Sequence, residues 1–370
     1  MNKIKLSKAS ISEIEKEAVL RVLDKEFLGM GEEVKLFEEK IKDYLNTSME
    51  VVCVNTGTSA LHLALSALDL KKGDEVLVPS LTYVASFQAI SAIGATAIAC
   101  EINPSTLFIS ITDLEKKISK KSRVIMPVHY ASNSSNMDEV YKLAKKYKLR
   151  VVEDAAQAFG SKRRGELIGT HGDIICFSFD GIKNITSGEG GAILSSDQGF
   201  IQRAQDGRLL GVEKDTDKRF SGIRSWSFNV NRQGYRYHMS NIMAAIGIVQ
   251  IDRIDSFKSK RQQIARTYIK ELKDVQEIEF LDFNFDEILP HIFVIKTKNR
   301  NKLKEFLTCN SIECGVHYMP NHLLSKYKTN YKLFVTEEVC ADILSLPCHY
   351  DLSVEEQGVV IEKIKEFYGG

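Results

Sequence analysis

The chain has 370 residues, and its 50 lysines and arginines balance 49 aspartates and glutamates to a formal net charge of +1. That balance leaves no basic excess to neutralise the phosphates of a nucleic acid or to hold an anionic membrane surface. The 44% hydrophobic content is enough for a large core, but apolar windows such as 89–100 are too short to span a membrane and the N-terminus has no apolar signal core, so we expect a soluble cytoplasmic protein.

The seven cysteines are odd in number, scattered and without CxxC spacing. Most lie inside apolar runs, as Cys53 and Cys176 do. This pattern favours buried reduced thiols over disulfides or zinc ligands, and we expect no metal site.

From about residue 50 to 200, short β-branched runs alternate with amphipathic helical patterns. The predicted strands are Glu50–Val54, Glu75–Val78, Thr96–Ile102, Arg123–Pro127, Arg150–Glu153, Asp173–Phe179 and Ala192–Ser195. The predicted helices between them include Ser59–Leu68, Val84–Ile93, Ile111–Ile118 and Met137–Tyr147. Such alternation predicts an α/β unit whose sheet is mostly parallel and covered by helices.

A long helical stretch from His238 to about Lys273 leads into a second, smaller α/β piece. Its predicted elements are a strand at His291–Lys296, a helix at Asn301–Thr308, a strand near Val316–Tyr318 and a terminal helix that opens with Ser353 and Glu356 in capping-box spacing. We therefore expect a large domain over residues 1–245, with the N-terminal segment included, and a small C-terminal domain over residues 246–370.

Three segments at predicted strand ends carry groups suited to chemistry. Asn55-Thr56-Gly57-Thr58-Ser59 joins a strand to a helix, so its N–H groups and hydroxyls suit a phosphate, with an ordinary helix cap as the alternative. Glu153 and Asp154 end a buried strand, where a carboxylate needs a cationic partner. Lys183 lies between glycine-rich segments, where a lysine can act as a neutral nucleophile unless it is simply solvated.

Taken together, these groups indicate a cofactor. A phosphate cradle, an acid for a pyridinium nitrogen and a lysine for an aldehyde are what pyridoxal 5'-phosphate (PLP) requires. The P-loop and dinucleotide-binding fingerprints GxxxxGK[ST] and GxGxxG are both missing from the sequence.

The chain resembles the DegT/DnrJ/EryC1/StrS family of nucleotide-sugar aminotransferases nearly end to end. The matching motifs are Gly31-x-x-Val34-x-x-Phe37-Glu38, Asn55-Thr-Gly-Thr-Ser-Ala-Leu-His-Leu-Ala-Leu65, Gly73-Asp-Glu-Val-Leu-Val-Pro79, Glu153-Asp-Ala-Ala-Gln-Ala158, Phe177-Ser-Phe179 with Lys183 and Gly188-Glu-Gly-Gly191, Met239-Ser-Asn-Ile-x-Ala-Ala-Ile-Gly247, Val316-His-Tyr-x-Pro320-x-His322 and Leu344-Ser-Leu-Pro347. This resemblance implies the PLP-dependent transferase fold type I, with a large cofactor domain and a smaller C-terminal α/β domain.

The resemblance also implies roles for single residues. Lys183 is expected to form the internal Schiff base and to serve as acid and base, and Asp154 to pair with the pyridine nitrogen. Gln157 is expected near the phenolic oxygen of the cofactor. The resemblance implies that Thr58, Ser59 and Ser178 contact the phosphate and that Tyr83 contacts the cofactor ring. It implies that Tyr318 and His322 border the sugar-nucleotide pocket.

Two segments depart from the pattern of the resembling family. Relatives usually carry an Asn that reaches the phosphate of the neighbouring subunit's cofactor, where this chain has Arg236 and His238. Arg236 is a candidate to replace it, and a plain interface role is the alternative. The loop 129–136 also replaces a more usual Leu-Tyr-Gly-Gln-Pro type. Because the active site of the family lies at a dimer interface, we expect a homodimer.

The implied reaction is ping-pong transamination from an amino donor, by family habit L-glutamate, to a nucleotide-linked keto sugar. The segments 4–7 and 28–31 look more like members that aminate C4 of a 4-keto-6-deoxy sugar than like C3 members, which stay the alternative. A sugar dehydratase is disfavoured because such members carry His where this chain has Lys183. A non-catalytic regulatory protein of the same fold is disfavoured because the cofactor residues of the large domain are present.

Overall fold

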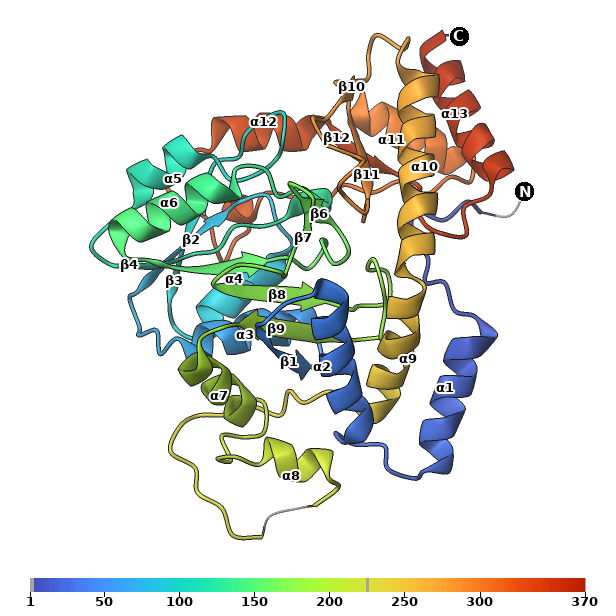
Figure 1. Ribbon diagram of the computed structural model, residues 1–370. Helices are drawn as coiled ribbons and strands as arrows, with labels where there is room; N and C mark the ends of the chain where they lie inside the picture. Colours follow the sequence, from blue (N-terminus) through green and yellow to red (C-terminus); the bar gives the residue numbers. More distant parts are fainter. Residues whose placement is uncertain (1–2, 224–225, 370) are drawn as a thin grey trace.

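The computed structural model describes residues 3–223 and 226–369. A seven-stranded sheet with the order β1-β9-β8-β5-β4-β2-β3 forms the centre of the large domain (Figure 1). Its strands are β1 (Glu50–Val54), β2 (Glu75–Pro79), β3 (Thr96–Cys100), β4 (Ser122–Ile125), β5 (Arg150–Asp154), β8 (Ile174–Ser178) and β9 (Gly191–Ser195). Only β9 runs antiparallel to its neighbours β1 and β8, which confirms the mostly parallel sheet that the sequence predicts.

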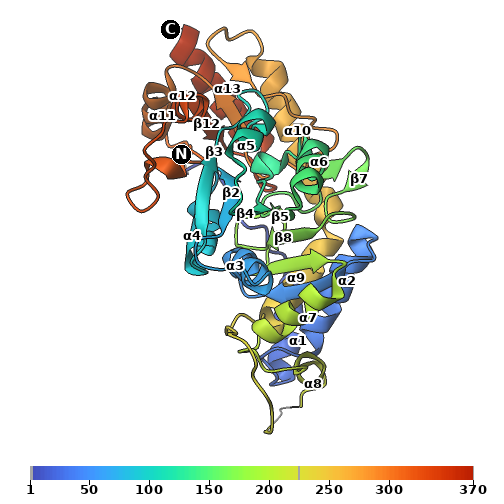
Figure 2. The same cartoon turned by 90° about the vertical axis from the view of Figure 1, so that its left-hand side faces the viewer.

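Helices cover both faces of this sheet because its strands alternate apolar side chains between the two faces. The face with Val52, Val76 and Val124 packs on α3 (Gly57–Ala67), α4 (Val84–Ala92) and α7 (Gln198–Gly207). The opposite face packs on α2 (Glu32–Leu45), α5 (Ile111–Lys117), α6 (Met137–Tyr147) and α9 (Asn241–Asp252). Figure 2 shows α4 and α6 on opposite sides of the strands. The carboxyl ends of the parallel strands therefore form a protected edge.

The small domain has its own antiparallel sheet and its own core. The strands are β10 (Glu279–Phe280), β11 (Phe293–Lys296) and β12 (Ile343–Leu346), and the helices are α10 (Ile254–Leu272), α11 (Arg300–Cys309), α12 (Phe334–Asp342) and α13 (Val354–Gly369). The capping box at Ser353 is confirmed, since Ser353 N donates to Glu356 Oε2 at 2.9 Å and Glu356 N to Ser353 Oγ at 3.0 Å. The remaining elements are α1 (Glu13–Asp24), β6 (Lys162–Arg163), β7 (Glu166–Leu167), α8 (Thr216–Phe220), η1 (Tyr130–Ser132) and η2 (Asn321–Leu323).

Three observations bear on the expected plan. Residue 245, where the domain division is expected, lies inside α9, which packs against α1 and α2 and ends at Asp252. Ile4 bridges Ile312 and is buried in the small-domain core, so the first residues described join that domain. Residues 316–318 form no strand, and in this segment only Gly315 bridges Ser345.

All seven cysteines are free thiols, and five of them are buried. Over residues 3–223 and 226–369, no cluster of side chains has the composition of a metal site. In the same ranges no helix combines the length and the apolar character that crossing a membrane demands.

A buried ion pair ties α1 to the junction between the two domains. The Glu15 side chain is buried and its Oε1 accepts from Arg253 Nη1 at 2.5 Å and from Gln250 Nε2 at 2.6 Å. Its Oε2 accepts from Ser12 N at 2.8 Å. Burial on its own raises the pKa of Glu15, but the hydrogen bonds from Ser12, Arg253 and Gln250 outweigh it and lower the pKa from 4.5 to about 2.

We expect Glu15→Gln to lower the free energy of unfolding at pH 7 by about 3 kcal/mol. Because the pKa of Glu15 is depressed in the folded chain, its stabilisation is complete above the unfolded pKa and disappears as the pH falls through the folded value. Urea unfolding at pH 7 and pH 3 measures the difference between variant and parent, which should shrink at the lower pH. Glu13→Gln, on the exposed side of the same turn, is the matched control, and an equal effect of both variants contradicts the prediction.

Candidate active site

Asp154 ends β5 at the edge where the parallel strands finish, and its carboxylate is buried. Oδ2 accepts from Ser86 Oγ at 2.7 Å, and Oδ1 accepts from Ala156 N at 3.2 Å. Burial raises the pKa of Asp154, against the opposing effects of Ser86, Ala156, Lys183 and His129. The charged form of a carboxylate in this environment is stabilised most by a hydrogen bond from a cationic N–H donor. Ser86 carries no motif, and the sequence analysis missed it.

Lys183 lies on the loop that joins β8 to β9, beyond Ser178. Its backbone N–H donates to Asp180 O at 3.0 Å, which turns the chain. The next residue, Asn184, donates through Nδ2 to Gln157 O at 3.1 Å and to Phe159 O at 3.0 Å, so the loop is fixed to the segment after Asp154. Burial lowers the pKa of Lys183, partly offset by Asp180 and Asp154. The amine is therefore easier to obtain in its neutral, nucleophilic form.

The N-terminus of α3 meets the end of β8 at very short range. A Cβ on Gly57 would stand 2.6 Å from the Cβ of Ser178, so only glycine allows this approach. Thr56 caps the helix by accepting from Ser59 N at 2.9 Å, whereas the N–H groups of Gly57 and Thr58 meet no acceptor among the described residues. These free donors and the Ser178 hydroxyl form a cradle for an anion.

Thr58 and Ser59 differ within this cradle. Thr58 is exposed at the helix start, where its hydroxyl is available to a ligand. Ser59 is buried and its Oγ donates to Asn55 Oδ1 at 2.6 Å, while it also meets Thr56 Oγ1 at 2.7 Å. The structure therefore uses the Ser59 hydroxyl to shape the turn that presents the cradle.

Gln157 has a fixed orientation beside Asp154. Its Oε1 accepts from Ala131 N at 2.7 Å, and its Nε2 donates to the Tyr318 hydroxyl at 3.0 Å. Tyr318 comes from the segment that precedes α12, so this bond joins the two domains. Tyr83 precedes the first residue of α4, and it is 58% exposed. The centroid of its ring lies 5.5 Å from the centroid of the Tyr318 ring. Tyr83 and Tyr318 thus lie over the same edge as Gln157.

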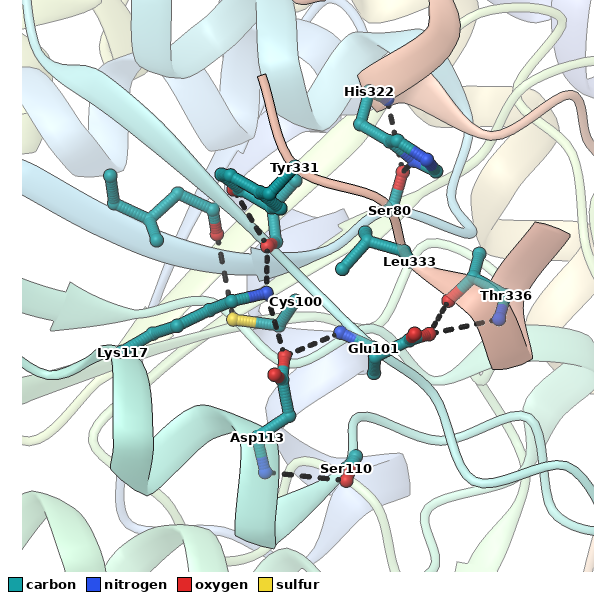
Figure 3. Close-up of polar contacts among 12 residues, drawn as sticks. Ser80, Cys100, Glu101, Ser110, Asp113, Lys117, His322, Tyr331, Leu333 and Thr336 are labelled. Carbon is teal, nitrogen blue, oxygen red and sulfur yellow. Dashed lines mark hydrogen bonds and ion pairs between the residues drawn. The ribbon is translucent and has the colours of Figure 1, made fainter. Parts of the chain in front are cut away.

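His322, by contrast, is buried and bonds within the chain through both ring nitrogens. Nδ1 meets Ser80 Oγ at 2.7 Å, and Nε2 meets Glu337 Oε1 at 3.2 Å (Figure 3 shows the Ser80 contact). These contacts join the end of β2 to α12, so the structure gives His322 a role in fixing the two domains together. Arg236 is exposed, and the part of the chain that the structure describes offers it no ion-pair partner.

A neighbouring polar network holds α12 against the edge of the large sheet (Figure 3). The Glu101 carboxylate accepts from Thr336 N at 2.8 Å and from Thr336 Oγ1 at 2.6 Å, which caps the helix start. Asp113 accepts from Glu101 N at 2.7 Å and pairs with Lys117 at 2.9 Å. This network helps to hold the segment that carries Tyr318 over the edge of the sheet.

The residues present fit PLP. The cradle of Gly57, Thr58 and Ser178 provides free N–H and O–H donors for a phosphate, Asp154 provides a buried carboxylate for a ring N–H, and Lys183 provides an amine for an aldehyde. Gln157 keeps a second amide hydrogen for an oxygen on the ring. The fold and this site together define a PLP-dependent enzyme of fold type I.

The chain belongs to the DegT/DnrJ/EryC1/StrS aminotransferase family, whose model matches residues 9–365. Among curated proteins it is similar to the GDP-perosamine synthase of Escherichia coli O157:H7, with 35% identity over 100% of this chain and 99% of the relative. The match therefore extends from one end of the chain to the other.

Two solved structures show the same architecture. The crystal structure of S. venezuelae DesV in complex with a ketimine intermediate matches with a TM-score of 0.88 at 30% identity, over 96% of this chain and 94% of the DesV chain. The putative sugar aminotransferase Spr1654 of Streptococcus pneumoniae, in its PLP form, has a TM-score of 0.91 at 28% identity over 99% of both chains. The fold type I prediction is thus confirmed, and so is the aminotransferase class with its PLP cofactor.

Proposed function

We propose that the protein transfers the amino group of L-glutamate to the C4 keto group of a nucleotide-linked 4-keto-6-deoxy sugar. The observation that carries the amino-transfer chemistry is a lysine of lowered pKa beside a buried carboxylate, next to an anion cradle. The end-to-end match to a relative named GDP-perosamine synthase supports a nucleotide-linked substrate, since the name of that relative describes a sugar joined to GDP. The C4 position rests on the resemblance of segments 4–7 and 28–31.

Each residue of the site has a defined task in this proposal. When bound, PLP supplies an aldehyde carbon that carries the amino group and a ring that withdraws electrons. Asp154 would accept a hydrogen bond from the ring N–H and stabilise the positive charge on that nitrogen. Lys183 moves a proton between the two carbon atoms that change oxidation level, because its neutral amine is accessible. Gln157 would donate its second amide hydrogen to an oxygen on the ring, and Tyr83 would contact the bound cofactor.

We also propose that two copies of the chain form a homodimer. Large apolar side chains are exposed on α1 and on the segment after α8, namely Ile14, Leu20, Ile223, Phe228 and Trp226, the last of which is 90% exposed. Ile223, Trp226 and Phe228 lie within six positions of one another in the sequence, and exposed apolar side chains gathered in this way are typical of an interface. Arg236 follows the same segment and is free to reach a phosphate bound to the partner. A solution mass of a single chain would rule the dimer out.

The substrate proposal is tested by loading the purified protein with PLP, converting it with L-glutamate and adding keto sugars in separate reactions. We expect amino transfer to 4-keto-6-deoxy sugars linked to GDP, dTDP or UDP, and the 3-keto compounds serve as the matched comparison. Mass spectrometry of the product measures the gain of an amino group. Turnover of the 3-keto compounds alone would show the C3 alternative to be right.

A further inference from the structure

The edge strand of the large sheet is closed by a buried ion pair instead of a further strand. β1 stands first in the strand order, and α2 and α7 both pack on it (Figure 1). Cys53 N donates to Glu38 Oε1 at 2.7 Å, and Cys53 O accepts from Arg208 Nη1 at 2.8 Å. Arg208 Nη1 also pairs with Glu38 Oε1 at 2.5 Å, and both side chains are buried. Two side chains therefore occupy the place of a neighbouring strand at Cys53.

Arg208 makes both of these contacts through one nitrogen. Nη1 bonds to the Glu38 carboxylate and to the Cys53 carbonyl, whereas Nε and Nη2 find no acceptor within residues 3–223 and 226–369. The guanidinium also lies over the Phe220 ring, 5.7 Å from the ring centroid. Because Arg208 is 0% exposed, an uncharged side chain in its place would leave the Glu38 carboxylate buried without its partner.

Arg208 also holds the segment that crosses the end of β1. Its carbonyl accepts from Tyr237 N at 3.0 Å, and the Tyr237 carbonyl accepts from Asn55 N at 2.7 Å. The turn that opens α3 begins directly after Asn55. Arg208 therefore fixes the end of β1 twice, through its side chain at Cys53 and through Tyr237 at Asn55.

The turn that follows has no room to shift on its other side. A Cβ on Gly57 would stand 2.6 Å from the Cβ of Ser178, and a Cβ on Gly191 would stand 2.4 Å from the carbonyl oxygen of Thr56. The ends of β8 and β9 thus lie against the turn from within the sheet. A small displacement of β1 would move the N–H groups of Gly57 and Thr58 away from the Ser178 hydroxyl, with which they form the anion cradle.

We propose that Glu38 and Arg208 form a positioning pair for the phosphate of the cofactor. The pair acts through the backbone of β1, because it fixes the distance between the N-terminus of α3 and Ser178 and so sets the affinity of the cradle for a phosphate group. This inference rests on the PLP chemistry of the proposed function but not on the identity of the sugar. It also gives a task to Glu38, which ends the motif at residues 31–38.

The test compares Arg208→Met with the parent protein in the affinity for PLP and for pyridoxal, which has the same ring and aldehyde but no phosphate. Equilibrium dialysis of the full-length chain measures both dissociation constants, and the visible absorbance of lysine-bound cofactor measures occupancy. We expect the dissociation constant of PLP to rise by about 10- to 100-fold, as for the loss of one hydrogen bond to a charged group. The dissociation constant of pyridoxal should stay within a few-fold, because Lys183 and Asp154 are unchanged.

Two further variants are matched to this comparison. Arg208→Lys should keep the PLP affinity within a few-fold of the parent, because a single amine at the position of Nη1 can make both contacts. Arg203→Met removes an arginine of α7 that also donates to a carbonyl, Ala67 O at 2.7 Å, but at the opposite end of α3 from the cradle. We expect Arg203→Met to bind both compounds as the parent does.

Circular dichroism and thermal unfolding show whether Arg208→Met is folded. If it is not, Glu38→Gln decides by the same comparison, since its amide oxygen can still accept from Cys53 N while the charge is lost. Unchanged PLP affinity in the folded variant would overturn the inference. Equal weakening of PLP and pyridoxal would overturn it as well, because the pair would then support the domain in general and not the phosphate. No keto sugar enters this test, whereas normal PLP binding without any amino transfer would defeat the proposed function alone.

Discussion

Lys183→Ala is expected to reduce amino transfer by about 10⁴-fold, because the chain then lacks the amine that moves the proton. The structure supports so large an effect, since burial lowers the pKa of this lysine and Asn184 holds its loop in place. Single-turnover rates with L-glutamate measure the loss. The visible absorbance band of lysine-bound cofactor should vanish in the same variant.

Two controls separate a catalytic effect from a folding effect. Lys120→Ala removes an exposed lysine and should leave both the rate and the absorbance unchanged. Added methylamine should partly restore the rate of Lys183→Ala, because a small amine can occupy the empty space and carry the proton. Full transamination by Lys183→Ala would refute the assignment of this residue.

Asp154→Asn is expected to lower the rate of the glutamate half-reaction by roughly 10³-fold. The carboxylate is buried, and Ser86 and Ala156 donate to its two oxygens. These bonds support a negative charge that the neutral amide cannot provide, so a cationic ring N–H loses its counter-charge. Stopped-flow absorbance with L-glutamate measures the rate, and equilibrium dialysis measures how much PLP stays bound.

Asp252→Asn is the matched control for this substitution, since Asp252 is exposed and pairs with Lys40 at 2.6 Å on the surface. We expect it to retain the parental rate. If Asp154→Asn keeps more than a tenth of that rate while it is folded and loaded, the ring N–H does not depend on this carboxylate.

The large sheet could be predicted from the sequence because its signals are local. Runs such as 174–177 are apolar on both faces, as a doubly covered strand requires, and the observed bounds differ from the predicted ones by a few residues. Asp154 and Lys183 could be singled out for the same reason, because each follows a predicted strand where ligands gather. Residues 316–318 misled the prediction because this segment bonds to the large domain instead of a neighbouring strand: Gln157 donates to the Tyr318 hydroxyl, and Tyr130 donates to the His317 carbonyl.

The rest of the site depends on contacts between segments that are distant in the sequence. Ser86 reaches Asp154 from a helix 68 positions earlier, and nothing in the Ser86 segment marks it. Arg261 looks like any arginine of a charged helix, and only the structure shows that it is buried and donates to the carbonyls of Pro290 and His291. The same holds for His322, whose motif indicated a substrate contact but whose ring nitrogens both bond within the chain.

The bridge between Ile4 and Ile312 has a consequence for how the protein folds during its synthesis on the ribosome. Ile4 must wait for a partner that is synthesised about 300 residues later, which takes roughly 15 to 60 s at ordinary rates of translation. During that time the central sheet can assemble from the segments between Ile4 and Ile312, while the segment that carries Ile4 has no partner to dock on. An N-terminal tag that hinders this late docking should therefore affect the yield of small-domain folding more than that of the large sheet.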